Sequence, residues 1–139
     1  LTCCGRGPMK SQIDAADGVE DRGFVQPHEL PSVMAEHGAF ILPSFYDTWG
    51  VVVAEAAASG MPVIATERCG VQIDIIRPYY NGLVIPTGDA DAIADALVWI
   101  DRHEQRLPEM GARARPFAEA FGEDAWADRW EAFFATLVR

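Results

Sequence analysis

The stretch GAFILPSFYDTWGVVVAEAAASGMPVIAT, residues 38–66, contains two apolar runs on either side of a segment with helical character. Residues 38–44 predict a strand, because they form a short apolar run bounded by turn residues. Residues 50–59 predict a helix, which ends at a Gly with a Pro just beyond it. Residues 63–66 predict a second strand. A strand, a helix and a strand in succession indicate an α/β fold with parallel strands.

The same alternation continues on both sides of this stretch. Asp89 is the expected N-cap of a long helix, because Asp accepts hydrogen bonds from the first free N–H groups. The predicted strands are short and apolar, as strands covered on both faces must be. The sequence therefore predicts a mostly parallel sheet with helices on both faces. Further strands are expected at residues 1–5, 23–25 and 81–86, and further helices before residue 16, at 28–37, at 71–76, after Asp89, and around Trp126, Trp130, Phe133 and Leu137.

The composition restricts the class of protein. The chain has 139 residues, a length that fits one domain, and a net charge of -10, which argues against nonspecific binding to nucleic acid or anionic membrane. No apolar run approaches the roughly 20 residues of a membrane span, and no signal-peptide pattern is visible. The three cysteines and three histidines lack metal-site spacing, so we expect reduced thiols, a cytoplasmic location and no metal.

Two acids, Asp47 and Glu55, lie eight positions apart in the apolar stretch. A buried carboxylate costs roughly several kcal/mol unless something pairs with it, and the sequence names no internal partner. The missing partner can be a ligand. The alternative is that Glu55 reaches solvent or an Arg, and that Asp47 is a loop or N-cap acid.

The expected position of these acids suggests which ligand. Ligands of parallel sheets bind at the carboxyl ends of strands, and the free N–H groups of a helix N-terminus hold phosphate. Gly50 lets the backbone approach such an anion. A vicinal diol suits Glu55, one turn below, because its two O–H donors satisfy both carboxylate oxygens. A nucleotide sugar would match: its sugar at Asp47, its diphosphate at the helix start and its ribose at Glu55.

A family resemblance agrees with this interpretation. The segment FILPSFYDTWGVVVAEAAASGMPVIATERCGVQIDII, with NGLVIPTGDADAIADAL behind it, resembles the C-terminal, donor-binding half of retaining GT-B glycosyltransferases of the family 4 type. LTCCGRGPM and DRGFVQPHELPSVMAEHGAFILPS extend the resemblance over nearly the whole chain. The sequence departs from the family signature E-x7-E, since Asp47 replaces the first Glu. The resemblance implies a Rossmann-like domain over residues 1–139 that binds a UDP- or GDP-linked sugar as substrate without a metal.

The resemblance also implies roles for single residues. Trp49 would shape the sugar pocket or else pack in the core, and Arg6 would approach the nucleotide or else lie in a solvated turn. Asp47 would contact sugar hydroxyls in the catalytic site, and Glu55 would hold the ribose. The backbone of Gly50, Val51 and Val52 would bind the diphosphate. Val25 and Pro27 would face the base.

Parts of the family pattern are missing from the sequence. The acceptor half is absent, and the chain begins at what resembles the second strand of the donor half. In the usual order 3-2-1-4-5-6 the first strand lies mid-sheet, so its absence leaves open edges. Three alternatives follow: the flanking strands pair directly, a second copy covers the gap, or the chain folds poorly alone. We expect a homodimer or a partner with the acceptor half, and little transferase activity alone. The Trp126 and Trp130 face also needs a cover, unless it packs on the chain's own sheet.

Two other functions remain open from the sequence. The chain can be a non-catalytic nucleotide-binding or structural dimer module derived from a truncated glycosyltransferase. A dinucleotide-dependent oxidoreductase is the other reading, because residues 5–10 begin like G-x-G-x-x-G. Lys10 replaces the third Gly, however, and Pro8 interrupts the motif.

Overall fold

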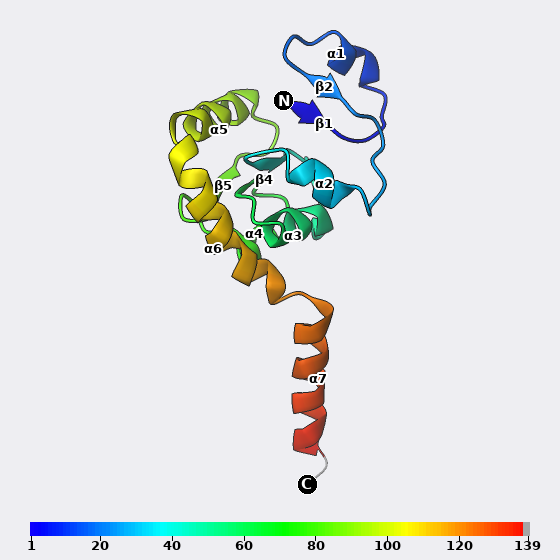
Figure 1. The fold of residues 1–139 in the computed structure, drawn as a ribbon, viewed down its shortest axis with the longest axis vertical. Helices are drawn as coiled ribbons and strands as arrows, with labels where there is room; N and C mark the ends of the chain where they lie inside the picture. Colours follow the sequence, from blue (N-terminus) through cyan, green and yellow to red (C-terminus); the bar gives the residue numbers. More distant parts are fainter. Residues whose placement is uncertain (138–139) are drawn as a thin grey trace. The chain divides into compact units, whose positions relative to one another are not determined.

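The computed structural model describes residues 1–137, which divide into two compact units (Figure 1). The first unit is Leu1–Val33, and the second begins at Met34. The first unit holds a two-stranded parallel sheet, in which Thr2 lies opposite Glu20. Its elements are β1 (Thr2–Cys3), α1 (Lys10–Asp14), β2 (Glu20–Asp21) and the start of α2 (Leu30–Met34).

The strand predicted at residues 23–25 is wrong by a few positions. The strand lies at Glu20–Asp21, and the chain leaves the sheet at Gly23, whose φ is +62°. The Gly23 N–H donates to the side chain of Asp21 rather than to a neighbouring strand. The apolar pair that follows Gly23 therefore belongs to a loop.

The second unit is built on a three-stranded parallel sheet in the order β3-β4-β5. Phe40 lies opposite Val63, and Val63 lies opposite Gly82. The elements are β3 (Phe40–Leu42), α3 (Val51–Ala58), β4 (Val63–Thr66), α4 (Gln72–Ile75), β5 (Gly82–Ile85), α5 (Ala90–Arg102), a 3-10 turn (Glu104–Arg106), α6 (Leu107–Glu119) and α7 (Glu123–Leu137).

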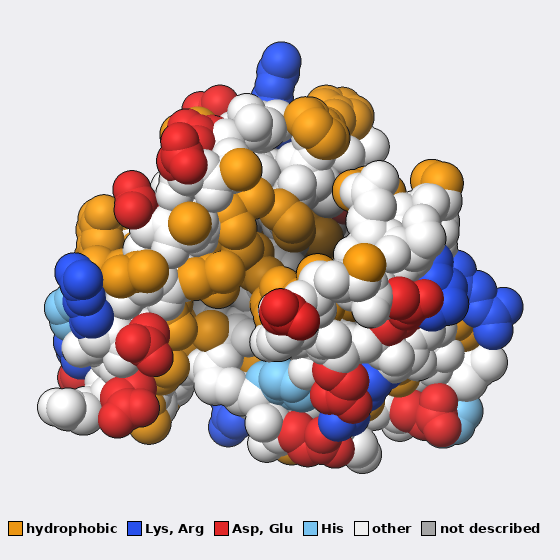
Figure 2. Space-filling model, turned by 90° about the horizontal axis from the view of Figure 1, so that it is seen from above, with side chains coloured by type: hydrophobic (Ala, Val, Ile, Leu, Met, Phe, Trp, Pro, Cys, Tyr) orange, Lys and Arg blue, Asp and Glu red, His pale blue; other side chains and the backbone are white. Residues whose placement is uncertain are grey.

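Charged side chains of both signs are interspersed on the face shown in Figure 2. Within the part of the chain that the structure describes, no helix has the length and apolar character needed to cross a membrane.

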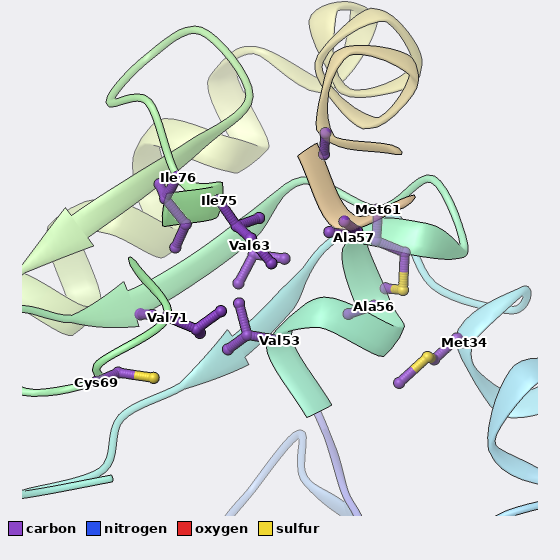
Figure 3. Close-up of a cluster of buried hydrophobic side chains, with 13 residues drawn as sticks. Met34, Val53, Ala56, Ala57, Met61, Val63, Cys69, Val71, Ile75 and Ile76 are labelled. Atoms are coloured by element: carbon purple, nitrogen blue, oxygen red, sulfur yellow. The ribbon is translucent and has the colours of Figure 1, made fainter. Parts of the chain in front are cut away.

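The core of the second unit lies on both faces of its sheet. Val63 and Ala65 of β4 join a cluster with α3, α4 and α6, in which Val53 and Ile75 lie close together (Figure 3). Ile64, which points the other way, packs with Leu83, Ile85 and the apolar face of α5. Because successive strand residues face opposite sides, this split confirms a sheet covered by helices on both faces.

The helix α6 was not predicted, although it contributes centrally to the core. Met110, Ala114 and Ala118 recur every four residues and are all buried, and the two alanines belong to the first cluster. Two prolines, one glycine and three alanines gave its segment a weak pattern of helical hydrophobic periodicity. Gly111 of α6 is packed so tightly that a Cβ there would overlap the carbonyl oxygen of Gly60.

We predict that Gly111→Ala lowers the free energy of unfolding by about 1–3 kcal/mol, because the new methyl group has no space against backbone. Urea unfolding followed by circular dichroism measures this. The neighbouring exposed substitution Ala112→Ser should change stability by no more than about 0.5 kcal/mol. Equal effects of the two substitutions would contradict the close approach of α6 to Gly60.

The loop before β5 is held by three pairs of a guanidinium and an aromatic ring. The loop contains Tyr79, the one described non-glycine residue with a positive φ, +61°. Arg106 donates to the Tyr79 carbonyl at 3.3 Å. The distances from guanidinium carbon to ring centroid are 5.0 Å for Arg77–Phe117, 4.6 Å for Arg113–Tyr80 and 5.6 Å for Arg106–Trp99.

The predicted amphipathic helix at the C-terminal end is confirmed as α7, but its described residues include no buried one. The alternative that its aromatic face packs on the chain's own sheet is therefore wrong. Trp130 instead contacts its neighbours on the same helix, with ring centroids 5.9 Å from Trp126 and 5.5 Å from Phe134.

Candidate functional site

Three loops meet at the carboxyl edge of the sheet in the second unit. They follow β3, β4 and β5, and parallel strands bring their carboxyl ends to the same edge. The Thr66 hydroxyl at the end of β4 donates to the Ser44 carbonyl after β3 at 2.7 Å. A Cβ on Gly88, after β5, would lie 3.0 Å from the ring of Phe45. The loops are therefore in mutual contact.

The loop that carries Asp47 is held by backbone hydrogen bonds to the loop after β4. The Asp47 N–H donates to the Arg68 carbonyl at 3.2 Å, and the Gly70 N–H donates back to the Asp47 carbonyl at 3.0 Å. Gly70 has no room for a side chain, since a Cβ would overlap the carbonyl oxygen of Thr48. The only sign of this support in the sequence is a Gly placed soon after a strand, so it was not predicted.

Asp47 is half-buried, and its Oδ1 accepts the Trp49 N–H at 3.1 Å. The chain itself thus uses Asp47 as a loop acid, as the simpler alternative expected, and its contact with a sugar stays a prediction. Burial and then the nearby Asp47 charge raise the pKa of the Cys69 thiol. The thiol therefore keeps its proton at neutral pH and donates to the Trp49 carbonyl, 3.4 Å away.

Gly50 is the N-cap of α3, and no side chain caps this helix. Its φ is +91°, and a Cβ there would lie 2.5 Å from Cys69 Sγ and 3.2 Å from Val71 Cγ1. The structure therefore gives a steric reason for Gly50, besides the expected approach to an anion. The first turn of α3 contains no acidic residue, so its N–H groups face no negative side chain of their own helix.

We predict that Gly50→Ala costs about 2–4 kcal/mol of stability, from the left-handed backbone and the clash with Cys69. In a Cys69→Ala background the same substitution should cost about 1 kcal/mol less, because the clash is relieved. Thermal and urea unfolding of the four proteins measure both terms. The same cost in both backgrounds would rule out the clash as a cause.

Glu55 is exposed, so the expectation of a buried and unpaired carboxylate is wrong. The exposed face of α3 carries Val51, which is 61% exposed, and Glu55 one turn later. Val53 and Ala56 face the core, while Val52 is half-buried against it. The exposed position of Glu55 leaves it accessible to a ligand.

Trp49 packs against the first core cluster, and its ring meets the edge of Phe121 with centroids 5.1 Å apart. The core-packing alternative for Trp49 therefore describes the structure. A part in a sugar pocket stays a prediction.

The two residues predicted to face the base belong to the first unit. Val25 is half-buried and Pro27 is exposed, both on the loop after β2. Phe24, on the same loop, lies under the guanidinium of Arg6, whose central carbon is 5.7 Å from the ring centroid. This loop borders a groove of about 700 Å³, which has an aromatic wall and several polar groups. The groove is lined by Arg22, Phe24, Val25, His28, Glu29, Ser32 and Val33.

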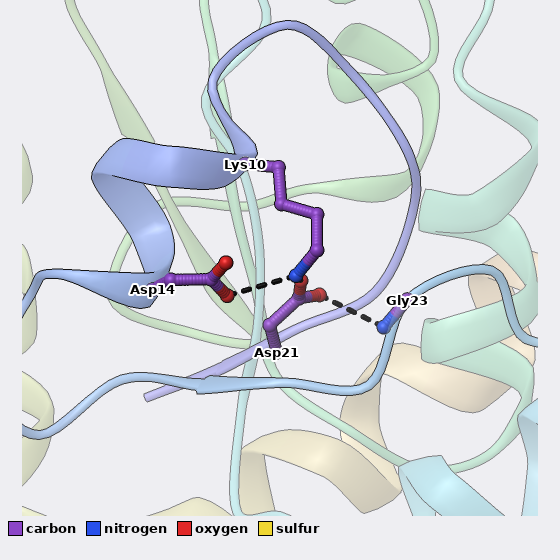
Figure 4. A network of polar contacts seen from close by, with 4 residues as sticks. All are labelled: Lys10, Asp14, Asp21 and Gly23. Carbon is purple, nitrogen blue, oxygen red and sulfur yellow. Dashed lines mark hydrogen bonds and ion pairs between the residues drawn. The ribbon is translucent and has the colours of Figure 1, made fainter.

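A polar network lies beside this loop, and the sequence analysis did not identify it. Lys10 Nζ donates to Asp14 at 2.8 Å and to Asp21 at 2.7 Å (Figure 4). The other oxygen of Asp21 accepts the Gly23 N–H at 2.8 Å. Lys10 and then Gly23 hold the pKa of Asp21 below its ordinary value of 3.8, and the two carboxylates raise the pKa of Lys10.

The Asp21 shift gives a pH dependence with a definite sign. A lowered pKa means that the stabilisation is present above pH 3.8 and is lost as the pH falls through the folded-state pKa. We predict that Lys10→Met lowers the thermal midpoint at about pH 7, and that this difference shrinks below about pH 4. Arg102→Met, at an exposed position in α5, is the control and should show no such trend. A difference that stays constant as the pH falls below about 4 would contradict the assignment.

Among residues 1–137, no three His, Cys, Asp or Glu side chains form a group that could hold a metal ion.

Comparison with known proteins identifies the family. Residues 1–102 match the family model described as Glycosyl transferases group 1. The chain belongs to the glycosyl transferases group 1 family. Its fold is that of the C-terminal domain of a GT-B glycosyltransferase, as the sequence predicted.

Relatives of this glycosyltransferase domain include sucrose-phosphate synthases. A probable sucrose-phosphate synthase of Solanum tuberosum is 46% identical over 101 residues, which is 73% of this chain and 9% of that protein. The structure of sucrose-phosphate synthase from Thermosynechococcus elongatus matches 99% of this chain and 38% of its own, at 26% identity and a TM-score of 0.82. The structure of Anabaena HepE in complex with UDP-glucose matches 99% of this chain and 40% of its own, at 17% identity and a TM-score of 0.77. The glycosyltransferase domain thus spans well under half of each of these proteins.

Proposed function

We propose that this chain is the donor-binding domain of a retaining glycosyltransferase that transfers a sugar, of the hexose type, from a UDP-sugar to an acceptor. The observation that carries the proposal is the uncapped N-terminus of α3 at the carboxyl edge of the sheet. Asp47 lies on the loop before it, and the exposed Glu55 lies one turn further along it. UDP is favoured over GDP because UDP-glucose is bound in the similar Anabaena structure.

Each part of the donor has a proposed contact. The diphosphate meets the N–H groups of Gly50, Val51 and Val52, whose partial positive charge stabilises the leaving group. Glu55 accepts the two ribose hydroxyls, and Asp47 accepts hydroxyls of the sugar. No metal is part of this proposal.

The base end of the donor is proposed to lie against the loop after β2. Val25 and Pro27 lie on this loop, which borders a groove with the exposed ring of Phe24 on its wall. An aromatic ring and nearby polar groups suit a planar heterocycle, which stacks on its face and hydrogen bonds at its edge.

The isolated chain is proposed to bind the donor with little transfer. Transfer requires donor and acceptor to be held together, and the proposed partner is an acceptor-binding half or a second copy. A cytoplasmic location is part of the proposal, in line with the three free cysteines.

A structural dimer module is the second candidate function. The observation that favours it is the exposed aromatic face of α7, since apolar surface of this kind is typical of interfaces. This candidate predicts a dimer that binds no nucleotide.

Calorimetry of the purified chain with UDP, GDP, ADP and UDP-glucose tests the proposed function. UDP should bind more tightly than the other two diphosphates. Glu55→Ala should weaken UDP binding at least about tenfold, because a carboxylate that accepts two hydroxyls is lost. Asp95→Ala, which removes an exposed carboxylate from α5, is the control and should leave the affinity unchanged.

Absence of binding at millimolar UDP would overturn the donor-site proposal, and a dimeric mass under the same conditions would then favour the structural module. Equal affinities of the wild type and Glu55→Ala would overturn the ribose assignment alone.

A further inference from the structure

The loop after β2, residues 22–27, lies at the surface and has only partial packing, at Val25 and between Phe24 and Arg6. It contains no helix or strand, and none of its residues is buried. Gly23 has a φ of +62°, and Gly5, in the loop after β1, has a φ of +141°. Glycines reach such conformations freely and leave them as freely. The direction in which the loop presents Phe24 and Val25 therefore depends on hydrogen bonds.

Two of those hydrogen bonds meet at one residue, Gly23. The Gly23 N–H donates to Asp21 Oδ1 at 2.8 Å, and the Gly23 carbonyl accepts the Gly5 N–H at 2.6 Å. The adjacent Arg22 N–H donates to the Cys3 carbonyl at 2.9 Å. Gly23 is thus held from both sides, once by backbone and once by a side chain.

The Asp21 side chain is itself held in place. Its Oδ2 accepts Lys10 Nζ at 2.7 Å, so its two oxygens have different partners (Figure 4). The Asp21 side chain is 13% exposed and that of Lys10 is 65% exposed, so the carboxylate is the shielded member of the pair. Lys10 also binds Asp14, which makes no contact with the loop in this network.

We propose that Asp21, oriented by Lys10, is a positioning residue that sets the loop after β2 for recognition of the nucleotide base. The inference rests on the proposed function, because that function brings the base to this loop. Asp21 acts through Gly23 and does not touch the ligand. Its loss should therefore affect how well the chain tells one base from another.

The two carboxylates that share Lys10 provide a matched pair of variants. Asp21→Ala removes both the link to Lys10 and the anchor of Gly23. Asp14→Asn weakens the hold on Lys10 and leaves Gly23 anchored. The readout is the ratio of UDP to ADP affinity, measured by calorimetry on the full chain. General damage to the fold lowers both affinities together and leaves this ratio unchanged.

We expect Asp21→Ala to reduce the UDP to ADP affinity ratio about fivefold or more, the effect of losing an oriented charged hydrogen bond. Asp14→Asn should keep the ratio within about twofold of the wild type. If Asp21→Ala does not fold, the UDP to ADP affinity ratio of Lys10→Met is measured in its place. This substitution frees the Asp21 carboxylate from Lys10 and leaves its hydrogen bond with the Gly23 N–H possible.

Each outcome has one meaning. A wild-type chain that does not bind UDP removes the proposed function and the inference with it. A wild type that binds UDP and ADP equally, or an Asp21→Ala variant with an unchanged ratio, overturns the inference and leaves the donor site standing. A fall in the ratio for Asp14→Asn equal to that for Asp21→Ala also overturns it, because the anchor of Gly23 would then not matter.

Discussion

The complete burial of β4 is the constraint on which the second unit depends. All four residues of this strand are buried, and both of its edges pair with parallel neighbours. A parallel strand with no solvent-exposed face needs packed elements on both sides of the sheet. Val63 and Ala65 are therefore covered by α3, α4 and α6, and Ile64 by α5. The same strand ends at Thr66, whose hydroxyl ties the loops of the candidate site together.

The sequence predicted those features that follow from local pattern. The apolar runs at β3, β4 and β5 and the Asp89 N-cap were correct, because burial on both faces and capping leave a direct mark on residue type. The segment of α6 left a weaker mark, since its contact depends on small residues at Gly111 and Ala114. Small residues show where another element comes close, but they do not show which element it is.

The candidate site was harder to predict for a different reason. Glu55 lies one turn into α3, as the sequence predicted, but its exposure depends on where α3 lies on the sheet, which residue spacing does not determine. Trp49 was equally ambiguous, because a large ring near a loop suits a core or a pocket. The hydrogen bonds of Asp47 with Arg68 and Gly70 are made by backbone, and backbone contacts across loops leave almost no signal in a sequence.

The loop before β5 has a consequence for which substitutions it tolerates. Arg77 of the loop, and Arg106 and Arg113 beside it, each place a guanidinium over a ring, so the flat shape of the group is used as well as its charge. Lysine would keep the charge but would lose the planar stacking surface. An Arg to Lys substitution, which leaves the net charge unchanged, would thus loosen the loop. This loop leads directly into β5, whose residues are mostly buried, so the chemical similarity of arginine and lysine does not make such substitutions neutral there.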